Sequence, residues 1–137
     1  MKEVHSHLLF AASLAASLAA ATLTSCGQSF DERFAQEVAR ENKVHCPQRL
    51  DAQTMLDSVA YSPATRTYTR FCSLPTASFD VVIQNAATVD QSLLSDLRSD
   101  TSWNTCKEEG ITFRYVYKDQ QNPQRIKEFV FAKERYQ

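Results

Sequence analysis

Two stretches of the sequence carry apolar residues at the spacing of an α-helix. In the first stretch these residues are Phe30, Phe34 and Val38, which follow one another at intervals of four. Ser29 and Glu32 form a capping box in front of them, in which each side chain accepts from the other residue's free backbone amide. The pattern predicts a helix that begins after Ser29, fades by residue 42 and stops before the proline at position 47.

The second helical stretch covers residues 79–101. Its apolar positions are Val82, Ala86, Val89, Leu93 and Leu97. The part 79–87 begins with aromatic and β-branched residues, so the sequence leaves open whether it is helix or strand. Thr88 and Gln91 form a second capping box, which predicts that the firm part of the helix begins at Val89.

Four further segments have the composition of β-strands. Residues 54–61 and 64–72 are rich in β-branched and aromatic residues, and Ser62-Pro63 between them predicts a hairpin turn. Residues 111–118 alternate strictly, with Ile111, Phe113, Tyr115 and Tyr117 on one face. The last strand, 124–133, follows a polar turn and ends in a continuous apolar run.

These elements predict an α+β fold with the order α-β-β-α-β-β. We expect a four-stranded antiparallel sheet with two helices packed on one of its faces. Gly110 provides the joint between the second helix and the third strand. Residues 29–137 therefore form one domain, which is long enough to bury a core of its own.

The beginning of the chain has the pattern of an export signal. After the mainly polar residues 1–7 comes Leu8–Thr22, an apolar run of 15 residues, whereas a membrane-spanning helix needs roughly 20. The run leads into Leu23-Thr24-Ser25-Cys26, which resembles the lipobox of bacterial lipoproteins. The resemblance implies that residues 1–25 are a signal peptide, cut between Ser25 and Cys26. An ordinary secreted protein with a plain thiol at Cys26 is the alternative.

The resemblance also implies a lipid anchor and a location. Cys26 would carry diacylglycerol on its sulfur and an acyl chain on its new amino group, and residues 26–28 would be the tether. The leader and the segment from Asn42 to Pro47 are similar to those of small envelope lipoproteins of Bacteroides-like bacteria. Because Gly27-Gln28 lacks the aspartate that marks inner-membrane retention, we expect the outer membrane, with the membrane face left open.

Composition narrows the classes of function. The chain has 15 basic and 16 acidic residues, so it lacks the basic excess of a nucleic-acid-binding protein. Its two glycines cannot form a phosphate-binding loop, and the sequence indicates no cofactor apart from the lipid.

Catalytic and metal-binding residues are not evident. His45 and Cys46 adjoin, but neighbours in an extended chain point to opposite sides, so His45 is poorly placed to activate the thiol. No metal site and no catalytic set is predicted. Cys46, Cys72 and Cys106 leave an odd number of cysteines, so pairing of Cys46 or Cys106 with Cys72 stays open, as do three free thiols.

Charge is distributed unevenly over the predicted elements. The predicted strands 64–72, 111–118 and 124–133 are basic, with Glu128 as their single acid, whereas the stretch 79–101 has four aspartates and only Arg98. If the basic faces coincide, they form one helix-free surface for an anionic partner. The residues of this surface are Arg66, Tyr68, Arg70, Arg114, Lys118, Arg125 and Lys127. Its partner would be an acidic envelope protein, a polysaccharide or lipid head groups; the alternative is a merely solvated basic face.

The sequence thus predicts a lipid-anchored envelope protein that acts as a non-catalytic binding or assembly module. One alternative is an inhibitor of an envelope-targeting enzyme that presents the segment 73–80 as a protruding loop. The other alternative is a thiol-dependent enzyme that uses Cys46.

Overall fold

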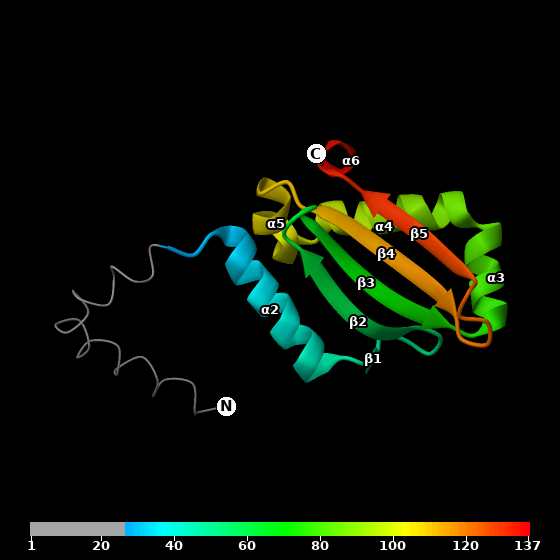
Figure 1. Cartoon of the computed structure of the whole chain (residues 1–137). Coiled ribbons are helices and arrows are strands. Elements are labelled where there is room, and N and C mark those ends of the chain that lie inside the picture. Colours follow the sequence, from blue (N-terminus) through cyan, green and yellow to red (C-terminus); the bar gives the residue numbers. More distant parts are fainter. Residues whose placement is uncertain (1–26) are drawn as a thin grey trace, which may run out of the picture. The chain divides into compact units, whose positions relative to one another are not determined.

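A computed structural model describes residues 27–137 of the chain. The predicted signal peptide and Cys26 lie outside the described residues. Residues Asp31–Gln137 form one compact unit, shown in Figure 1 with the element labels used below.

The described chain alternates helices and strands in the predicted order, with short additions. The helices are α2 (Phe30–His45), α3 (Thr76–Gln84), α4 (Ala86–Ser99), the 3₁₀ helix η1 (Thr101–Trp103), α5 (Asn104–Glu108) and α6 (Lys133–Tyr136). The strands are β1 (Gln48–Arg49), β2 (Met55–Ser62), β3 (Thr67–Leu74), β4 (Thr112–Asp119) and β5 (Ile126–Phe131).

The sheet confirms the α+β class and the antiparallel pairs β2–β3 and β4–β5, but the prediction of a four-stranded, wholly antiparallel sheet is wrong. It has five strands in the order β1-β2-β3-β4-β5, and β3 pairs with β4 in parallel while the other neighbours are antiparallel. The reason is the connection between β3 and β4. Helices α3, α4 and α5 carry the chain back to the end of the sheet where β3 begins, so β4 starts beside the start of β3.

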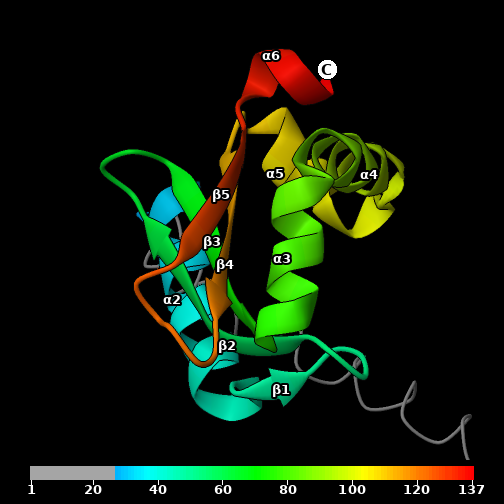
Figure 2. The ribbon, with the colours of Figure 1, turned by 90° about the vertical axis from the view of Figure 1, so that its right-hand side faces the viewer.

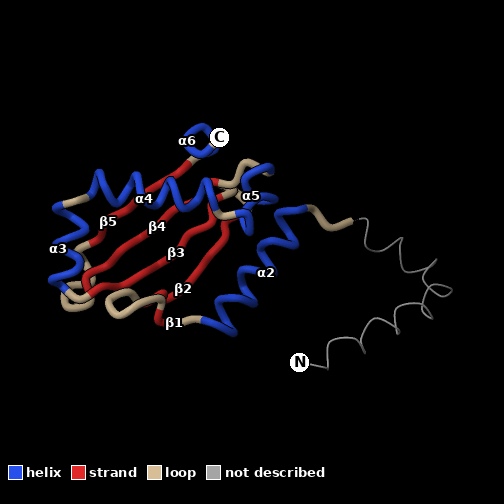
Figure 3. Tube along the Cα trace, turned by 180° about the vertical axis from the view of Figure 1, so that it is seen from behind, coloured by secondary structure: helices blue, strands red, loops and turns tan. Residues whose placement is uncertain are grey.

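More helices cover the sheet than the two predicted. Figure 2 shows α3, α4 and α5 on one side of the strands. In Figure 3, which views the molecule from the opposite side to Figure 1, α3 and α4 lie on the viewer's side of the sheet. Helix α2 runs along the outer edge of β2 in Figures 1 and 3. There the side-chain oxygen of Asn42 accepts a hydrogen bond from the Val59 amide at 2.9 Å, which satisfies a donor on that edge.

An aromatic cluster joins α2 and η1 over the same face of the sheet. The ring of Tyr68 in β3 lies 5.9 Å from Phe34 of α2 and 5.0 Å from Trp103 of η1, measured between centroids. Phe113 of β4 lies 5.4 Å from Trp103. The helix-covered face therefore holds the core, as the alternation of β4 predicted.

Several predicted element bounds are wrong. The stretch 79–87, for which the sequence allowed helix or strand, is helical. The two helices α3 and α4 are separated at Asn85 rather than before Val89, so the Thr88 capping box lies inside α4. The hairpin turn extends to Arg66, which has a φ of 49°, so β3 begins three residues later than predicted. The last strand ends at Phe131, because residues from Lys133 turn into α6.

Candidate functional site

The seven residues of the predicted anionic-partner surface do not share one face. In the parallel ladder Arg70 of β3 lies opposite Tyr115 of β4, so the two side chains lie on the same face. Arg114 is the next residue to Tyr115 and lies on the other face, opposite Thr69. Tyr68 is buried in the aromatic cluster on the helix-covered face. The prediction of a single basic surface is therefore wrong.

The helix-free face carries balanced charges. Arg114 donates hydrogen bonds to Glu128 of β5, and the Nζ of Lys118 lies 3.9 Å from a carboxylate oxygen of Asp57. The other oxygen of Asp57 accepts from the hydroxyl of Ser73 at 3.0 Å. Because both predicted cations on this face have an acidic neighbour, the face presents no excess positive charge.

A shallow groove of about 320 Å³ lies at one end of the helix-free face. Its lining is rich in hydroxyl groups, and its only cation is Arg114, which Glu128 already neutralises. The lining residues are Ala60, Tyr61, Ser62, Thr65, Thr67, Thr69 and Arg114.

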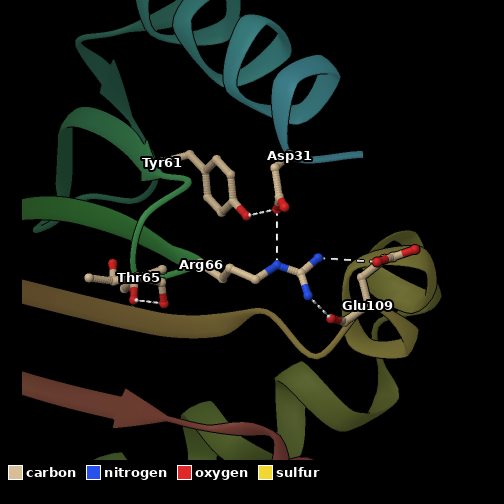
Figure 4. Close-up of polar contacts among 6 residues, drawn as sticks. Asp31, Tyr61, Thr65, Arg66 and Glu109 are labelled. Atoms are coloured by element: carbon tan, nitrogen blue, oxygen red, sulfur yellow. Dashed lines mark hydrogen bonds and ion pairs between the residues drawn. The ribbon is translucent and has the colours of Figure 1, made fainter. Parts of the chain in front are cut away.

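Arg66 belongs to a polar network at the end of the β2–β3 hairpin (Figure 4). Its Nε lies 3.0 Å from Asp31 of α2, and its two terminal nitrogens donate to the backbone and the carboxylate of Glu109 at 2.8 and 3.1 Å. Tyr61 donates to the same oxygen of Asp31 at 2.5 Å. All three guanidinium nitrogens are engaged, so Arg66 ties three elements together instead of facing a ligand.

Arg125 is held in a similar way at the opposite end of the sheet. It donates to Asp80 of α3 at 2.6 Å and to Asp119 at 2.9 Å, and its guanidinium carbon lies 4.9 Å from the centroid of Phe79. Lys127 lies on edge strand β5, on the helix-covered face, with its Nζ 5.3 Å from the centroid of Phe129. Neither residue lies beside Arg70.

Arg70 has different surroundings from the other predicted arginines. It is half-buried in an inner strand, and its guanidinium carbon lies 5.9 Å from the ring centroid of Tyr115. Within residues 27–137 no carboxylate comes within ion-pair distance of it. A positive charge that is partly removed from water without a counter-ion is costly, and such residues are candidates for ligand binding.

The titratable groups around Arg70 cannot supply the missing negative charge. Burial raises the pKa of Tyr68 and of Tyr117 to about 12, and the pKa of Cys72 to about 11. Burial also raises the pKa of Tyr115. The nearby Arg70 charge lowers each of these values and burial outweighs it, so phenols and thiol stay neutral at pH 7.

The His45–Cys46 pair has no geometry for thiol chemistry. The Nδ1 of His45 lies 3.0 Å from a carboxylate oxygen of Glu41. Burial, followed by the charge of Glu41, raises the pKa of the Cys46 thiol, which is the opposite of activation. In the described part of the chain Cys46, Cys72 and Cys106 are all free thiols, and no group of three or more ligating side chains is placed to hold a metal ion.

The predicted inhibitory loop 73–80 is wrong. Ser73 and Leu74 end strand β3, and residues from Thr76 onward form α3. Ser73, Leu74 and Phe79 are buried, so this segment cannot protrude into an enzyme's active site.

The neighbours of Arg70 are not evident from the sequence alone. The alternation of β4 placed Tyr115 and Tyr117 on one face, which was correct. Only the parallel pairing of β3 with β4 shows that this face is the one that carries Arg70. The sequence signal for parallel pairing was the length of the connection between the two strands. Parallel neighbours need a connection of a dozen or more residues, usually helical, and this connection is longer than that.

Comparisons with known proteins give a family and a fold. The model of a family described as a domain of unknown function, DUF8479, matches residues 29–127. A crystal structure from Pseudomonas aeruginosa, of a protein described as a candidate secreted protein, is similar with a TM-score of 0.68 at 15% identity. The alignment covers 81% of this chain and 100% of that one, and at this identity it shows a shared fold. No curated protein matches the sequence.

Among the helices of the described residues, none has the length and apolar content that a membrane span requires.

Proposed function

The chain belongs to the DUF8479 family, which has no assigned activity, and we propose from its residues that it is an exported, lipid-anchored protein of the bacterial envelope. In this proposal its folded domain is a non-catalytic binding or assembly module. Lipid on Cys26 anchors the protein in the outer rather than the inner membrane. The binding module uses no cofactor.

The sequence before the domain supports the anchor. A short apolar run followed by Leu23-Thr24-Ser25-Cys26 is the arrangement in which lipoproteins are cut and acylated, and helix α2 begins only four residues after Cys26. Two or three acyl chains on one residue hold a protein at a membrane durably, whereas one chain holds it weakly. The likeness to a candidate secreted protein agrees with export of this fold.

The half-buried, uncompensated charge of Arg70 is the observation that favours a binding module. Arginine is one of the residues that dominate protein–protein interfaces. By contrast, Cys46 has a raised pKa and segment 73–80 is buried, so we do not extend the proposal to a thiol enzyme or a loop inhibitor.

Metabolic labelling tests the anchor. The full-length gene is expressed in a bacterium fed an alkyne analogue of palmitate, and wild type is compared with Cys26→Ser and with Cys46→Ser as a matched control. We expect label and membrane sedimentation in wild type and Cys46→Ser, and loss of both in Cys26→Ser. A soluble, unlabelled wild-type protein cut before residue 26 would refute the lipid anchor.

A further inference from the structure

We propose that Arg70 binds a carboxylate on an acidic segment of a partner protein, at the helix-covered face of the sheet. The inference rests on the proposed role as a binding module, and it does not depend on the lipid anchor. It replaces the basic surface predicted on the helix-free face, where the charges are balanced.

The charge distribution singles out Arg70. Of the predicted cations, Arg66, Arg114, Lys118 and Arg125 each lie beside a carboxylate of the chain itself. Arg70 and Lys127 do not, within the described residues. Lys127 lies on an edge strand and ends in a compact ammonium on a flexible stem that can reach water. Arg70 lies on an inner strand and is half-buried, so its charge is partly desolvated, and a carboxylate of a ligand would supply the counter-charge.

The aromatic surroundings favour a carboxylate held in a defined direction. Tyr68 and Tyr115 are buried, with 6% and 9% of their surface exposed, and they lie on the same sheet face as Arg70. Tyr115 holds one side of the guanidinium by a cation–π contact. A guanidinium whose orientation is fixed presents a planar pair of N–H donors, which matches the two oxygens of a carboxylate.

A protein partner fits these residues better than a polyanion does. Nucleic acids and anionic polysaccharides repeat their charges and are bound by several cations in a row. Here one half-buried guanidinium, which has no ion-pair partner within the described residues, lies in a chain of net charge −1, and arginine is enriched at protein interfaces. One aspartate or glutamate side chain of the partner would pair with Arg70, and the peptide on either side of it would add contacts that a free carboxylate cannot make.

Binding of a capped tetraglutamate peptide to the full chain in a non-ionic detergent tests the inference. The titration follows the backbone amide resonances of residues 69–71 by NMR at 150 mM salt, because these are present in wild type and in every variant, with a capped tetraglutamine peptide, inorganic phosphate and glucuronate as comparison ligands. We expect a saturable shift with the glutamate peptide, and affinity at least tenfold lower for phosphate, glucuronate and the glutamine peptide.

Arg70→Gln should lower the affinity for the glutamate peptide at least tenfold. Arg114→Gln changes the matched arginine on the opposite face and should alter this affinity less than twofold. If Arg70→Gln does not fold, Arg70→Lys keeps the charge but loses the planar fork, and it should still weaken binding severalfold. Equal losses in Arg70 and Arg114 variants, no saturable shift, or phosphate or glucuronate as tight as the peptide would each overturn the inference. None of these results depends on lipid at Cys26, so failure of the anchor is seen separately.

Discussion

Solvent reaches the three cysteines of the described chain to different extents. Cys72 and Cys106 are buried, and burial raises the pKa of both thiols to about 11. Cys46 is half-buried at the end of α2, and its pKa is also raised. Because the thiolate is the reactive form, we infer that none of the three is activated at neutral pH.

Alkylation rates test this inference. With iodoacetamide at pH 8 we expect Cys46 to react first, and Cys72 and Cys106 to react at least tenfold more slowly than in urea, since two pKa units mean roughly a hundredfold less thiolate. Mass spectrometry of the peptides that carry each cysteine measures the rates. Faster modification of Cys46 in the folded protein than in urea would instead indicate an activated thiolate and support the thiol-enzyme alternative.

At the residue level the sequence could identify Arg70 and Arg114 but could not tell them apart. Both arginines lie in strands that are rich in β-branched and aromatic residues, and each has an aromatic residue beside it in the sequence. Their difference lies in which face each occupies and whether Glu128 is within reach, and both depend on strand pairing.

Among the elements, the joint between α5 and β4 depends on one glycine. The Gly110 amide donates to Lys107 and the Ile111 amide donates to Cys106, which is the Schellman pattern of a helix end. Gly110 has a φ of 74°, in the left-handed region that glycine adopts without a steric penalty. This joint sets the start of β4 and with it the register opposite β3.

Gly110→Ala should lower the free energy of unfolding by about 1 kcal/mol or more, because alanine is strained at positive φ. The added Cβ would also lie 3.2 Å from the Lys133 Cδ. Urea denaturation followed by circular dichroism measures the change. Gly27→Ala is the control, since a Cβ there meets nothing within 4 Å; an unchanged Gly110→Ala midpoint would contradict the structural role of this turn.

Most elements could be predicted from local patterns. The intervals of four in α2 and the alternation in β4 describe how each segment buries its own apolar face, and such patterns need no knowledge of neighbours. The two-residue strand β1 and the four-residue helix α6 are too short to show a period, so the sequence could not reveal them. At the break the Asn85 side chain does not cap α4, and its amide nitrogen donates to the Val81 carbonyl instead, so no capping box marks this position.

Across the whole molecule, ion pairs join elements that are distant in sequence. Asp31 of α2 pairs with Arg66 of the hairpin, Asp90 of α4 pairs with Arg135 of α6, and Asp80 of α3 pairs with Arg125, which also pairs with nearby Asp119. Asp119 is 1% exposed. Burial alone would raise its pKa, but hydrogen bonds from Thr76, from two backbone amides and from Arg125 outweigh burial and hold the pKa below its usual value.

This carboxyl should therefore contribute to acid sensitivity. A group whose pKa is lowered on folding stabilises the protein at pH values above its unfolded pKa of 3.8, and this contribution is lost as the pH falls through the folded value. Asp119→Asn should be less stable than wild type at pH 7, and the difference should shrink at pH 2.5. Urea denaturation at both pH values measures this.

Asp96→Asn, a change at an exposed aspartate of α4, is the matched control and should differ little from wild type at either pH. A difference between wild type and Asp119→Asn that stays constant from pH 7 to pH 2.5 would contradict the lowered pKa.

The sequence by itself determined the α+β class, the order of the main elements, the core face of β4 and the basis for expecting an anchor at Cys26, because each depends on a pattern within one segment. Only the tertiary structure decided that β3 and β4 run parallel, that the predicted basic surface is divided between two faces, and that Arg70 has no counter-ion among residues 27–137. The physical reason is that a charge is compensated by whatever lies within a few ångströms of it. Those neighbours come from strands and helices far apart in the sequence, and the long helical connection between β3 and β4 brings them together.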